Sequence, residues 1–432
     1  MAKDTSKNLR NQIMYQIFPR QYSNTHDFEG IRCDLNRIRD LGVDIIYLMP
    51  IFPIGVKNRK GCIGSPYSIY DYRKVNPDYG SLEDFHNLVD DIHAKGMKVI
   101  IDVAYNHTSR DSVLLQEHPE WFYRDKEGNF NNRVGEWWDV TDFDYTKDHA
   151  LWDELIDILC YWVEEGVDGF RLDVAPLVPK KFWKEARSAL KKLNKDVILY
   201  AESIHPGFVK WIRILGFEAM TDFECYESFD YTYDYDISDE ANAYFKGEAK
   251  LNLWLDALLK QEGRYPSNFL KSHCLSNHDN PRIASYIDDK DRLINLWALN
   301  IFLKGVTFIY AGDEVCAKKC PSLFEIDPVD WSNLGASYLV PVIQKMANIK
   351  KYAIVRDGHY DIHLNDLNVA YVEYFTENER LIGIFNPSLI EGNLKLENIQ
   401  DGTYKNLFNG QNVNVEAGIL EVTNEPVIIH LK

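Results

Sequence analysis

Four short apolar segments of the 432-residue chain end in side chains that can carry out acid–base and nucleophilic chemistry. Paired carboxylates at such positions can cleave a glycosidic bond by double displacement, one as nucleophile and one as acid/base. Taken singly, a carboxylate at a strand end is more often a helix N-cap or a surface ion-pair partner. Here the pattern recurs at Asp102-Val-Ala-Tyr-Asn-His107, Gly169-Phe-Arg-Leu-Asp173, Leu199-Tyr-Ala-Glu202 and Leu275-Ser-Asn-His-Asp279.

The elements that must position these residues follow a repeating pattern of short β-rich runs and longer helical segments. This alternation is typical of βα units around a parallel sheet, and the continuous apolar character of most runs fits strands buried on both faces. Eight strands favour an α/β fold of the (β/α)8 TIM barrel type, whose catalytic groups lie at the C-terminal ends of strands. The expected strands are 13–18, 44–49, 97–103, 169–174, 197–202, 219–223, 272–277 and 306–311.

Two regions do not follow this alternation of strands and helices. A long aromatic-rich segment follows the third strand, and connections of this length are usually lids or inserted subdomains. After about Lys351 the pattern changes to short strands separated by Asp-Gly and Asn-Gly turns, which predicts an antiparallel β-sandwich. The expected division is 1–107 for the first part of the catalytic barrel, 108–145 for a short inserted domain B, 146–350 for the second part of the barrel, and 351–432 for the C-terminal sandwich.

Composition and charge exclude several classes of partner. The formal net charge is -18, and no Lys/Arg-rich stretch interrupts it, so nucleic acids and anionic membrane surfaces would be repelled. No apolar run is long enough to cross a bilayer. The polar segment 1–7 lacks the apolar stretch of a secretory signal, so we expect a cytoplasmic protein acting on a neutral substrate. The sequence does not indicate an oligomeric state.

These segments, in this order, resemble the α-amylase family of glycoside hydrolases, and the resemblance spans nearly the whole chain. Gly42-Val-Asp-Ile-Ile-Tyr-Leu-Met-Pro50 resembles the second-strand motif of that family, Tyr67-Ser-Ile-Tyr-Asp-Tyr72 its sugar-platform motif, and Asp142-Phe-Asp144 a segment near the end of its inserted domain. The resemblance implies a retaining glycosidase that cleaves α-1,4-glucosidic bonds in starch-derived maltodextrins. An α-glucan oligosaccharide is then the partner, and the chemistry requires no cofactor.

The resemblance also implies a role for each matching residue. Asp173 is expected to be the nucleophile and Glu202 the general acid and base, while Asp279 is expected to hold sugar hydroxyls and support the transition state. Arg171 should keep Asp173 ionised, and Glu202 should hold the proton. The expected substrate-binding residues are Tyr67, His107, Arg171 and His278.

Metal binding is the point at which the chain departs most from secreted members of the family. Many of these carry Lys-His shortly after the nucleophile, at a position linked to sugar contacts and calcium, whereas this chain has Pro176-Leu177. Asn106 and Asp142 match two other calcium positions and offer the oxygen ligands that Ca²⁺ prefers. If a structural calcium ion is bound, these two residues are its expected ligands.

Other activities remain open at the level of sequence. A 4-α-glucanotransferase would intercept the same covalent intermediate with a sugar hydroxyl, and a cyclomaltodextrinase would use the same carboxylates. Activity of the α-glucosidase type is less favoured, because Ser68 stands where such enzymes commonly carry an Asp after the platform tyrosine. A barrel without catalysis is disfavoured by the presence of Asp173, Glu202 and Asp279 together.

Overall fold

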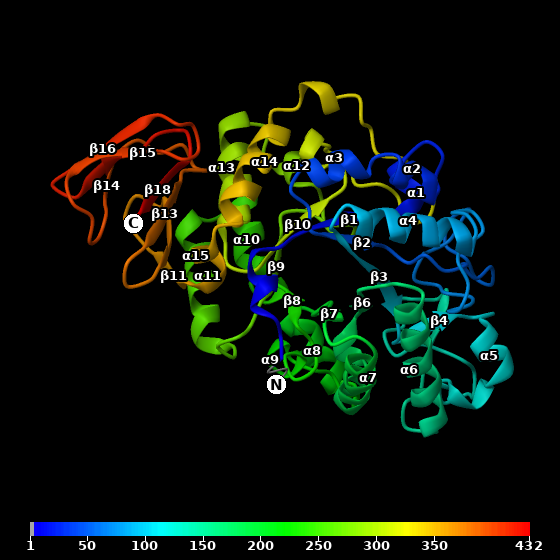
Figure 1. Ribbon diagram of the computed structural model, residues 1–432. Coiled ribbons are helices and arrows are strands. Elements are labelled where there is room, and N and C mark those ends of the chain that lie inside the picture. Colours follow the sequence, from blue (N-terminus) through cyan, green and yellow to red (C-terminus); the bar gives the residue numbers. More distant parts are fainter. Residues whose placement is uncertain (1–3) are drawn as a thin grey trace.

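The predicted TIM barrel is confirmed by the computed structural model, which describes residues 4–432 (Figure 1). Eight parallel strands close in the order β1-β10-β9-β8-β7-β6-β3-β2. All the pairs between these strands are parallel, so the carboxyl ends of the strands meet at one end of the barrel. The strands are β1 (Ile13–Ile17), β2 (Ile45–Leu48), β3 (Lys98–Ala104), β6 (Gly169–Asp173), β7 (Ile198–Ala201), β8 (Tyr231–Tyr233), β9 (Lys271–Cys274) and β10 (Val306–Tyr310).

The sixth strand of the barrel lies later in the chain than the sequence predicted. The expected strand 219–223 is wrong, because Asp222–Cys225 forms the short helix α9. Thr221 caps this helix by accepting a hydrogen bond from the backbone of Glu224, whose side chain bonds back to Thr221. This capping box fixes a helix start and outweighs the apolar character of the segment. The aromatic strand β8 takes the sixth place instead.

Alternate residues of the strands fill two separate apolar layers. In β1, Met14 packs inside the barrel, whereas Ile13 and Tyr15 pack outward against the helices. This explains why the strands have continuously apolar sequences. Large aromatic side chains dominate the interior, and they close the barrel beneath its catalytic end. They are Tyr47, Tyr200, Tyr231, Tyr233, Phe308 and Tyr310.

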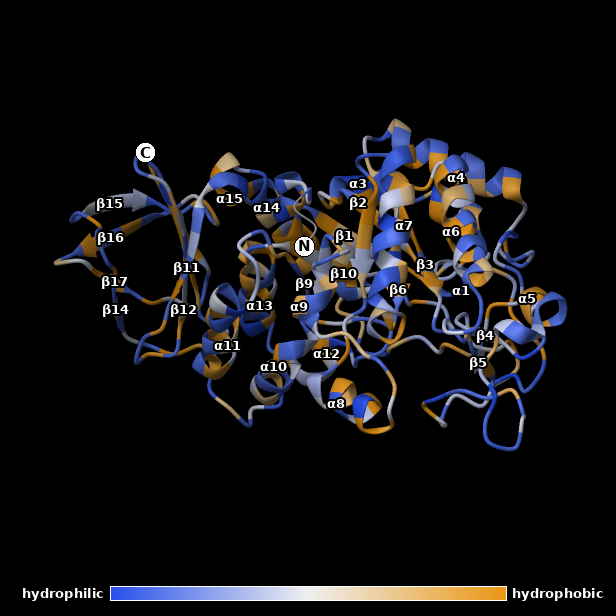
Figure 2. Ribbon diagram, turned by 90° about the horizontal axis from the view of Figure 1, so that it is seen from below, coloured by the Kyte–Doolittle hydropathy of each residue, from blue (hydrophilic) through white to orange (hydrophobic). Residues whose placement is uncertain are grey.

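Helices surround the barrel and pack their apolar sides against its strands. In Figure 2 the strands at the centre of the molecule are largely hydrophobic. In α4, Ser81 and Asp84 form a capping box, and Phe85 and Leu88 are fully buried. The helices are α1 (Pro19–Tyr22), α2 (Phe28–Arg32), α3 (Leu35–Asp40), α4 (Leu82–Ala94), α6 (His149–Glu164), α7 (Lys180–Leu193), α8 (Pro206–Ile214), α9, α10 (Ser238–Phe245), α11 (Leu251–Arg264), α12 (Ile283–Tyr286), α13 (Lys290–Phe302) and α14 (Leu339–Lys350). None of the described helices has the length and apolarity needed to span a membrane.

The segment after β3 and the C-terminal sheets lie at opposite ends of the molecule in both views (Figures 1 and 2). The former contains α5 (Val113–Glu117) and pairs β4 (His107–Ser109) with β5 (Val140–Asp142). Helix α15 (Ala353–Asp357) leads into two four-stranded antiparallel sheets with a shared apolar core, which confirms the predicted sandwich. Their strands are β11 (His359–His363), β12 (Ala370–Phe375), β13 (Arg380–Phe385) and β18 (Val427–Leu431), and β14 (Asn393–Lys395), β15 (Gly402–Lys405), β16 (Asn412–Glu416) and β17 (Ile419–Glu421).

Candidate active site

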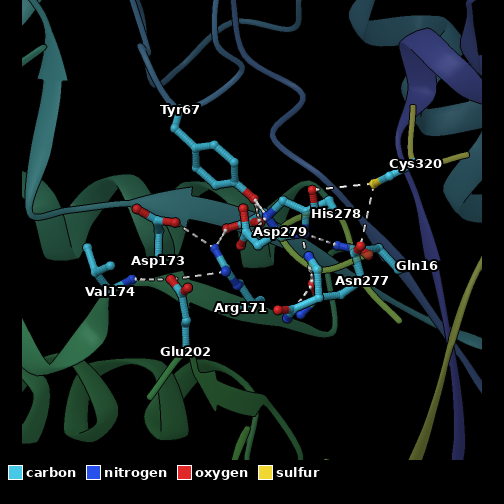
Figure 3. Close-up of polar contacts among 12 residues, drawn as sticks. Gln16, Tyr67, Arg171, Asp173, Val174, Glu202, Asn277, His278, Asp279 and Cys320 are labelled. Atoms are coloured by element: carbon cyan, nitrogen blue, oxygen red, sulfur yellow. Dashed lines mark hydrogen bonds and ion pairs between the residues drawn. The ribbon is translucent and has the colours of Figure 1, made fainter. Parts of the chain in front are cut away.

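A cavity of about 450 Å³ lies among the side chains that follow the carboxyl ends of the barrel strands. The topology brings together residues that are far apart in the sequence, and five of the predicted site residues line the cavity. These five are Tyr67, His107, Asp173, Glu202 and Asp279. Figure 3 shows Asp173 and Glu202 beside Arg171, with Asp279 next to His278. The remaining two predicted residues, Arg171 and His278, are buried directly behind this lining.

Arg171 links three carboxylates from three neighbouring strands. Its Nη1 lies 2.9 Å from Oδ1 of Asp102 and 2.8 Å from Oδ1 of Asp173, and its Nη2 lies 3.0 Å from Oε2 of Glu202. The guanidinium is fully buried, so it cannot be screened by water. Its planar arrangement of donors therefore fixes Asp173 and Glu202 side by side at the wall of the cavity.

The backbone after Asp173 adopts an unusual conformation that ties the two carboxylates together. Val174 lies in the left-handed region, with φ 35° and ψ 43°, which is rare for a β-branched residue. Its N–H donates a hydrogen bond of 2.7 Å to Oε2 of Glu202. Local strain of this kind persists only where the surrounding structure enforces it, and it is common at active sites. Both the N–H of Val174 and the guanidinium of Arg171 contact Oε2 of Glu202, so Oε1 takes part in neither contact.

Burial and the charge of Arg171 act in opposite directions on the pKa of Asp173. Burial and the neighbouring Glu202 raise the pKa of Asp173 well above its usual range, and Arg171 opposes this shift. From the sequence, Arg171 is expected to keep Asp173 ionised. In the structure, however, the single positive charge of Arg171 serves Asp102 and Glu202 as well. Because Arg171 is shared among three carboxylates, it only partly offsets the rise in the pKa of Asp173.

Tyr67 is held at the cavity wall by two hydrogen bonds of its hydroxyl group. It donates to Oδ2 of Asp102 at 2.8 Å, and it lies 2.7 Å from Nε2 of His278. The rings of Tyr67 and His278 are stacked, with centroids 5.6 Å apart. The ring of His278 has two further partners. Its Nδ1 lies 2.8 Å from Nε2 of Gln16, and its Nε2, which faces Tyr67, also lies 3.1 Å from Oδ2 of Asp279. The ring of Tyr67 is thus fixed as a flat surface facing the cavity.

The two histidines are uncharged near neutral pH. Burial, followed by the positive charge of Lys60, lowers the pKa of His107 to about 3, and burial with Arg171 lowers the pKa of His278 to about 4. Nε2 of His107 lies 3.8 Å from Oδ2 of Asp173. A neutral imidazole can donate one hydrogen bond and accept another, which suits contacts with the hydroxyl groups of a sugar.

Lys60 also lines the cavity, although nothing in the sequence indicates it, because it lies on an irregular loop between β2 and α4. Its Nζ forms an ion pair of 2.9 Å with Oδ1 of Asp139 and lies 4.6 Å from the ring centroid of Trp138 and 6.0 Å from that of Phe324. Lys60, Asp139 and Phe324 line the cavity. Lys60 therefore joins its own loop to the loops of Asp139 and Phe324 at the wall of the cavity. Neither hydrophobic periodicity nor a sequence motif indicates this contact.

The tryptophans of the inserted segment occupy different environments. Trp137 lines the cavity and packs against His107, with ring centroids 5.2 Å apart. Trp138 is 58% exposed beside Lys60. Trp121 is buried and stacks on His118, away from the residues that line the cavity. Of the three, Trp137 is therefore the one placed to contact a ligand in the cavity.

The two candidate calcium ligands are neighbours but already have other partners. Nδ2 of Asn106 lies 3.3 Å from Oδ1 of Asp142, and Oδ2 of Asp142 accepts a hydrogen bond of 2.8 Å from the backbone N–H of Arg133. Calcium takes about six to eight oxygen ligands. The described residues include no group of three or more His, Cys, Asp or Glu side chains suited to a metal ion. This donor set does not fit Ca²⁺.

Comparison with known protein families matches two regions of the chain. Residues 16–132 and 116–345 match the family described as "Alpha amylase, catalytic domain". Residues 361–429 match "Bacterial Alpha amylase C-terminal domain". The first match covers the barrel except for the first residues of β1, includes all the residues that line the cavity, and exceeds half of the chain.

Solved structures and curated proteins give the same picture. An α-amylase from Lactobacillus plantarum is 40% identical, with a TM-score of 0.94 over 99% of this chain and 100% of that one. A maltogenic α-amylase from Thermotoga neapolitana is 32% identical, with a TM-score of 0.87 over 98% and 99% of the two chains. An intracellular maltogenic amylase of Bacillus subtilis is 26% identical over an alignment that spans 90% of this chain and 71% of the relative.

Proposed function

The chain belongs to the α-amylase family of glycoside hydrolases, and we propose that it cleaves α-1,4-glucosidic bonds in starch-derived maltodextrins with retention of configuration. The observation that carries this proposal is the placement of Asp173 and Glu202 on one buried guanidinium at a cavity wall. Two adjacent carboxyl groups are what double displacement requires. The relatives named as maltogenic amylases support an α-glucan as the substrate.

In the first step, Asp173 attacks the anomeric carbon and its carboxylate oxygen forms an ester bond to the sugar. The bond from that carbon to the leaving oxygen breaks, and its electron pair goes to this oxygen, which takes a proton from Glu202. Tyr67 stacks beneath the ring, His107, His278 and Asp279 hold its hydroxyl groups, and Arg171 orients Asp173 from behind the cavity wall. The carboxylates of Asp173 and Asp279 support the developing positive charge. The leaving sugar then departs with its new hydroxyl group.

In the second step, Glu202 accepts a proton from water as the water oxygen attacks the same carbon. The ester bond to Asp173 breaks, its electron pair returns to the carboxylate, and the proton on Glu202 is restored. Two inversions at one carbon give net retention. A neutral sugar substrate is consistent with the protein's net charge of -18. We place the reaction in the cytoplasm because a relative is named as an intracellular maltogenic amylase.

A time course of products tests this function. Purified protein is incubated with maltoheptaose, β-cyclodextrin or pullulan, and the products are separated by chromatography. We expect new reducing ends and shorter maltodextrins from maltoheptaose from the earliest times. Absence of cleavage by folded protein on all three substrates would contradict the proposal. Products longer than the substrate would identify transfer to a sugar rather than to water as the main reaction.

Lys60 is expected to restrict the chain lengths of the maltodextrin products, because it joins three loops at the cavity wall. Lys60→Ala removes the ion pair with Asp139 and opens this wall. The first products from end-labelled maltoheptaose should shift toward a broader range of lengths, with kcat/KM changed by less than about tenfold, since Lys60 contacts the cavity wall and not the two catalytic carboxylates. Lys57→Ala, on the exposed part of the same loop, is the control. Identical product ratios for Lys60→Ala and the wild type would contradict this role.

A further inference from the structure

The side chain of Arg133 occupies the junction at which the α-amylase resemblance points to calcium. Its Nη1 lies 3.3 Å from Oδ2 of Asp142, and its Nη2 donates a hydrogen bond of 2.9 Å to the carbonyl oxygen of Phe143. The backbone N–H of Arg133 donates to the same carboxylate oxygen at 2.8 Å. A buried carboxylate requires a compensating charge, and Asp142 is completely buried.

Aromatic rings complete the surroundings of this guanidinium. Its central carbon lies 5.1 Å from the ring centroid of Tyr123 and 5.4 Å from that of Phe217, which are distances of cation–π contact. Tyr123 belongs to the inserted segment, whereas Phe217 follows helix α8 on the barrel. The two rings also meet edge to face, with centroids 6.0 Å apart. Arg133 therefore joins the inserted segment to the barrel.

The contacts of Asp142 continue to the cavity. Asp142 pairs with His107 in the register of β4 and β5, and its Oδ1 lies 3.3 Å from Nδ2 of Asn106. Nδ2 of Asn106 in turn lies 3.2 Å from Nδ1 of His107, which lines the cavity. A cation at Asp142 thus stabilises the segment that carries a wall of the active site.

A metal ion and this guanidinium are alternatives at one carboxylate. Bringing Ca²⁺ to Oδ2 of Asp142 would place a divalent cation against the positive charge of Arg133, and the carbonyl oxygen of Phe143 is also already engaged. We propose that Arg133 is a built-in cation that takes the place of a structural calcium ion between the inserted segment and the barrel. The chain is therefore stable without calcium.

The wild-type protein provides the first test. Its melting temperature is measured by differential scanning fluorimetry in buffer alone, with excess EDTA, and with millimolar CaCl₂, and its metal content is determined by elemental analysis. A ligand that binds only the native state raises the melting temperature. We expect the same melting temperature in all three conditions and less than stoichiometric calcium. A fall in EDTA or a rise in CaCl₂ would overturn the proposal.

The second test removes the cation. Arg133→Met keeps an unbranched side chain that fills the space of the aliphatic part of Arg, but it leaves Asp142 without a charge partner, so we expect the melting temperature to fall by about 5 °C or more. The matched control is Arg124→Met, because Arg124 belongs to the same segment and lies 3.8 Å from the ring centroid of Phe130 but does not contact Asp142. The control should change the melting temperature by less than half as much.

A double variant separates charge compensation from simple loss of packing. Asp142→Asn removes the buried charge, so the variant Arg133→Met with Asp142→Asn should be more stable than Arg133→Met alone. Loss of packing alone predicts the opposite, since the second substitution then removes a further native contact. A double variant no more stable than Arg133→Met, or an Arg133→Met variant as stable as the wild type, would show that Arg133 is not the compensating cation.

Discussion

Replacing Asp173 with Asn is expected to abolish cleavage of maltodextrins, with a loss in kcat of about 10⁴-fold or more. The amide keeps the shape of the side chain but cannot form the ester bond to the anomeric carbon. The loss should be the same with α-glucosyl fluoride, since a better leaving group does not replace a missing nucleophile. Fluoride release and reducing-sugar formation measure the two reactions.

A matched control separates chemistry from folding. Asp196→Asn makes the same isosteric change on the exposed loop between α7 and β7, and its activity should equal that of the wild type. The melting temperature of Asp173→Asn should not fall far, because removal of one of several like charges around Arg171 also relieves repulsion. Turnover of the fluoride by Asp173→Asn would assign the nucleophile to another residue.

Replacing Glu202 with Gln is expected to separate the two steps of the reaction. Cleavage of maltodextrins should fall by about 10² to 10⁴-fold, because a sugar alkoxide is a poor leaving group without a proton donor. Fluoride leaves without a proton, so α-glucosyl fluoride should still form the ester on Asp173 and give a burst of fluoride. The ester then accumulates, since water lacks its general base, and mass spectrometry of the intact protein detects it.

An added nucleophile provides the control for this assignment. Azide ion needs no proton removed, so it should restore turnover of the fluoride by Glu202→Gln and yield an α-glucosyl azide. In Asp173→Asn no ester forms, so azide must displace fluoride directly, and any azide product should be the inverted β-anomer. If Glu202→Gln instead lost the burst while Asp173→Asn retained it, the roles of the two carboxylates would be reversed.

The barrel could be predicted because its signals are local and repeated. Each βα unit combines a short apolar strand with an amphipathic helix, and strands such as 306–311 were placed within one residue of their observed ends. The sixth strand differs from the prediction because Ala219, Met220 and Phe223 are as apolar as a strand, whereas the capping box of Thr221 and Glu224 starts a helix there. Local hydrogen bonding decided the structure there.

The candidate site was predictable to the extent that barrel topology dictates it. Residues at the carboxyl ends of different strands must meet, which is why Asp173, Glu202 and Asp279 line one cavity. The roles of Lys60 and Arg133 were not predictable in this way. Both lie on irregular loops, and each acquires its role from partners brought near by the fold of another loop.

The anomeric configuration of the first product tests the central claim most directly. Proton NMR is recorded during the earliest turnovers on maltoheptaose, before mutarotation mixes the anomers. Double displacement through Asp173 predicts that the newly formed reducing end appears first as the α-anomer and that the β-anomer follows at the rate of mutarotation. Initial appearance of the β-anomer would mean that water attacks the sugar directly, and it would contradict the assignment of Asp173 as nucleophile.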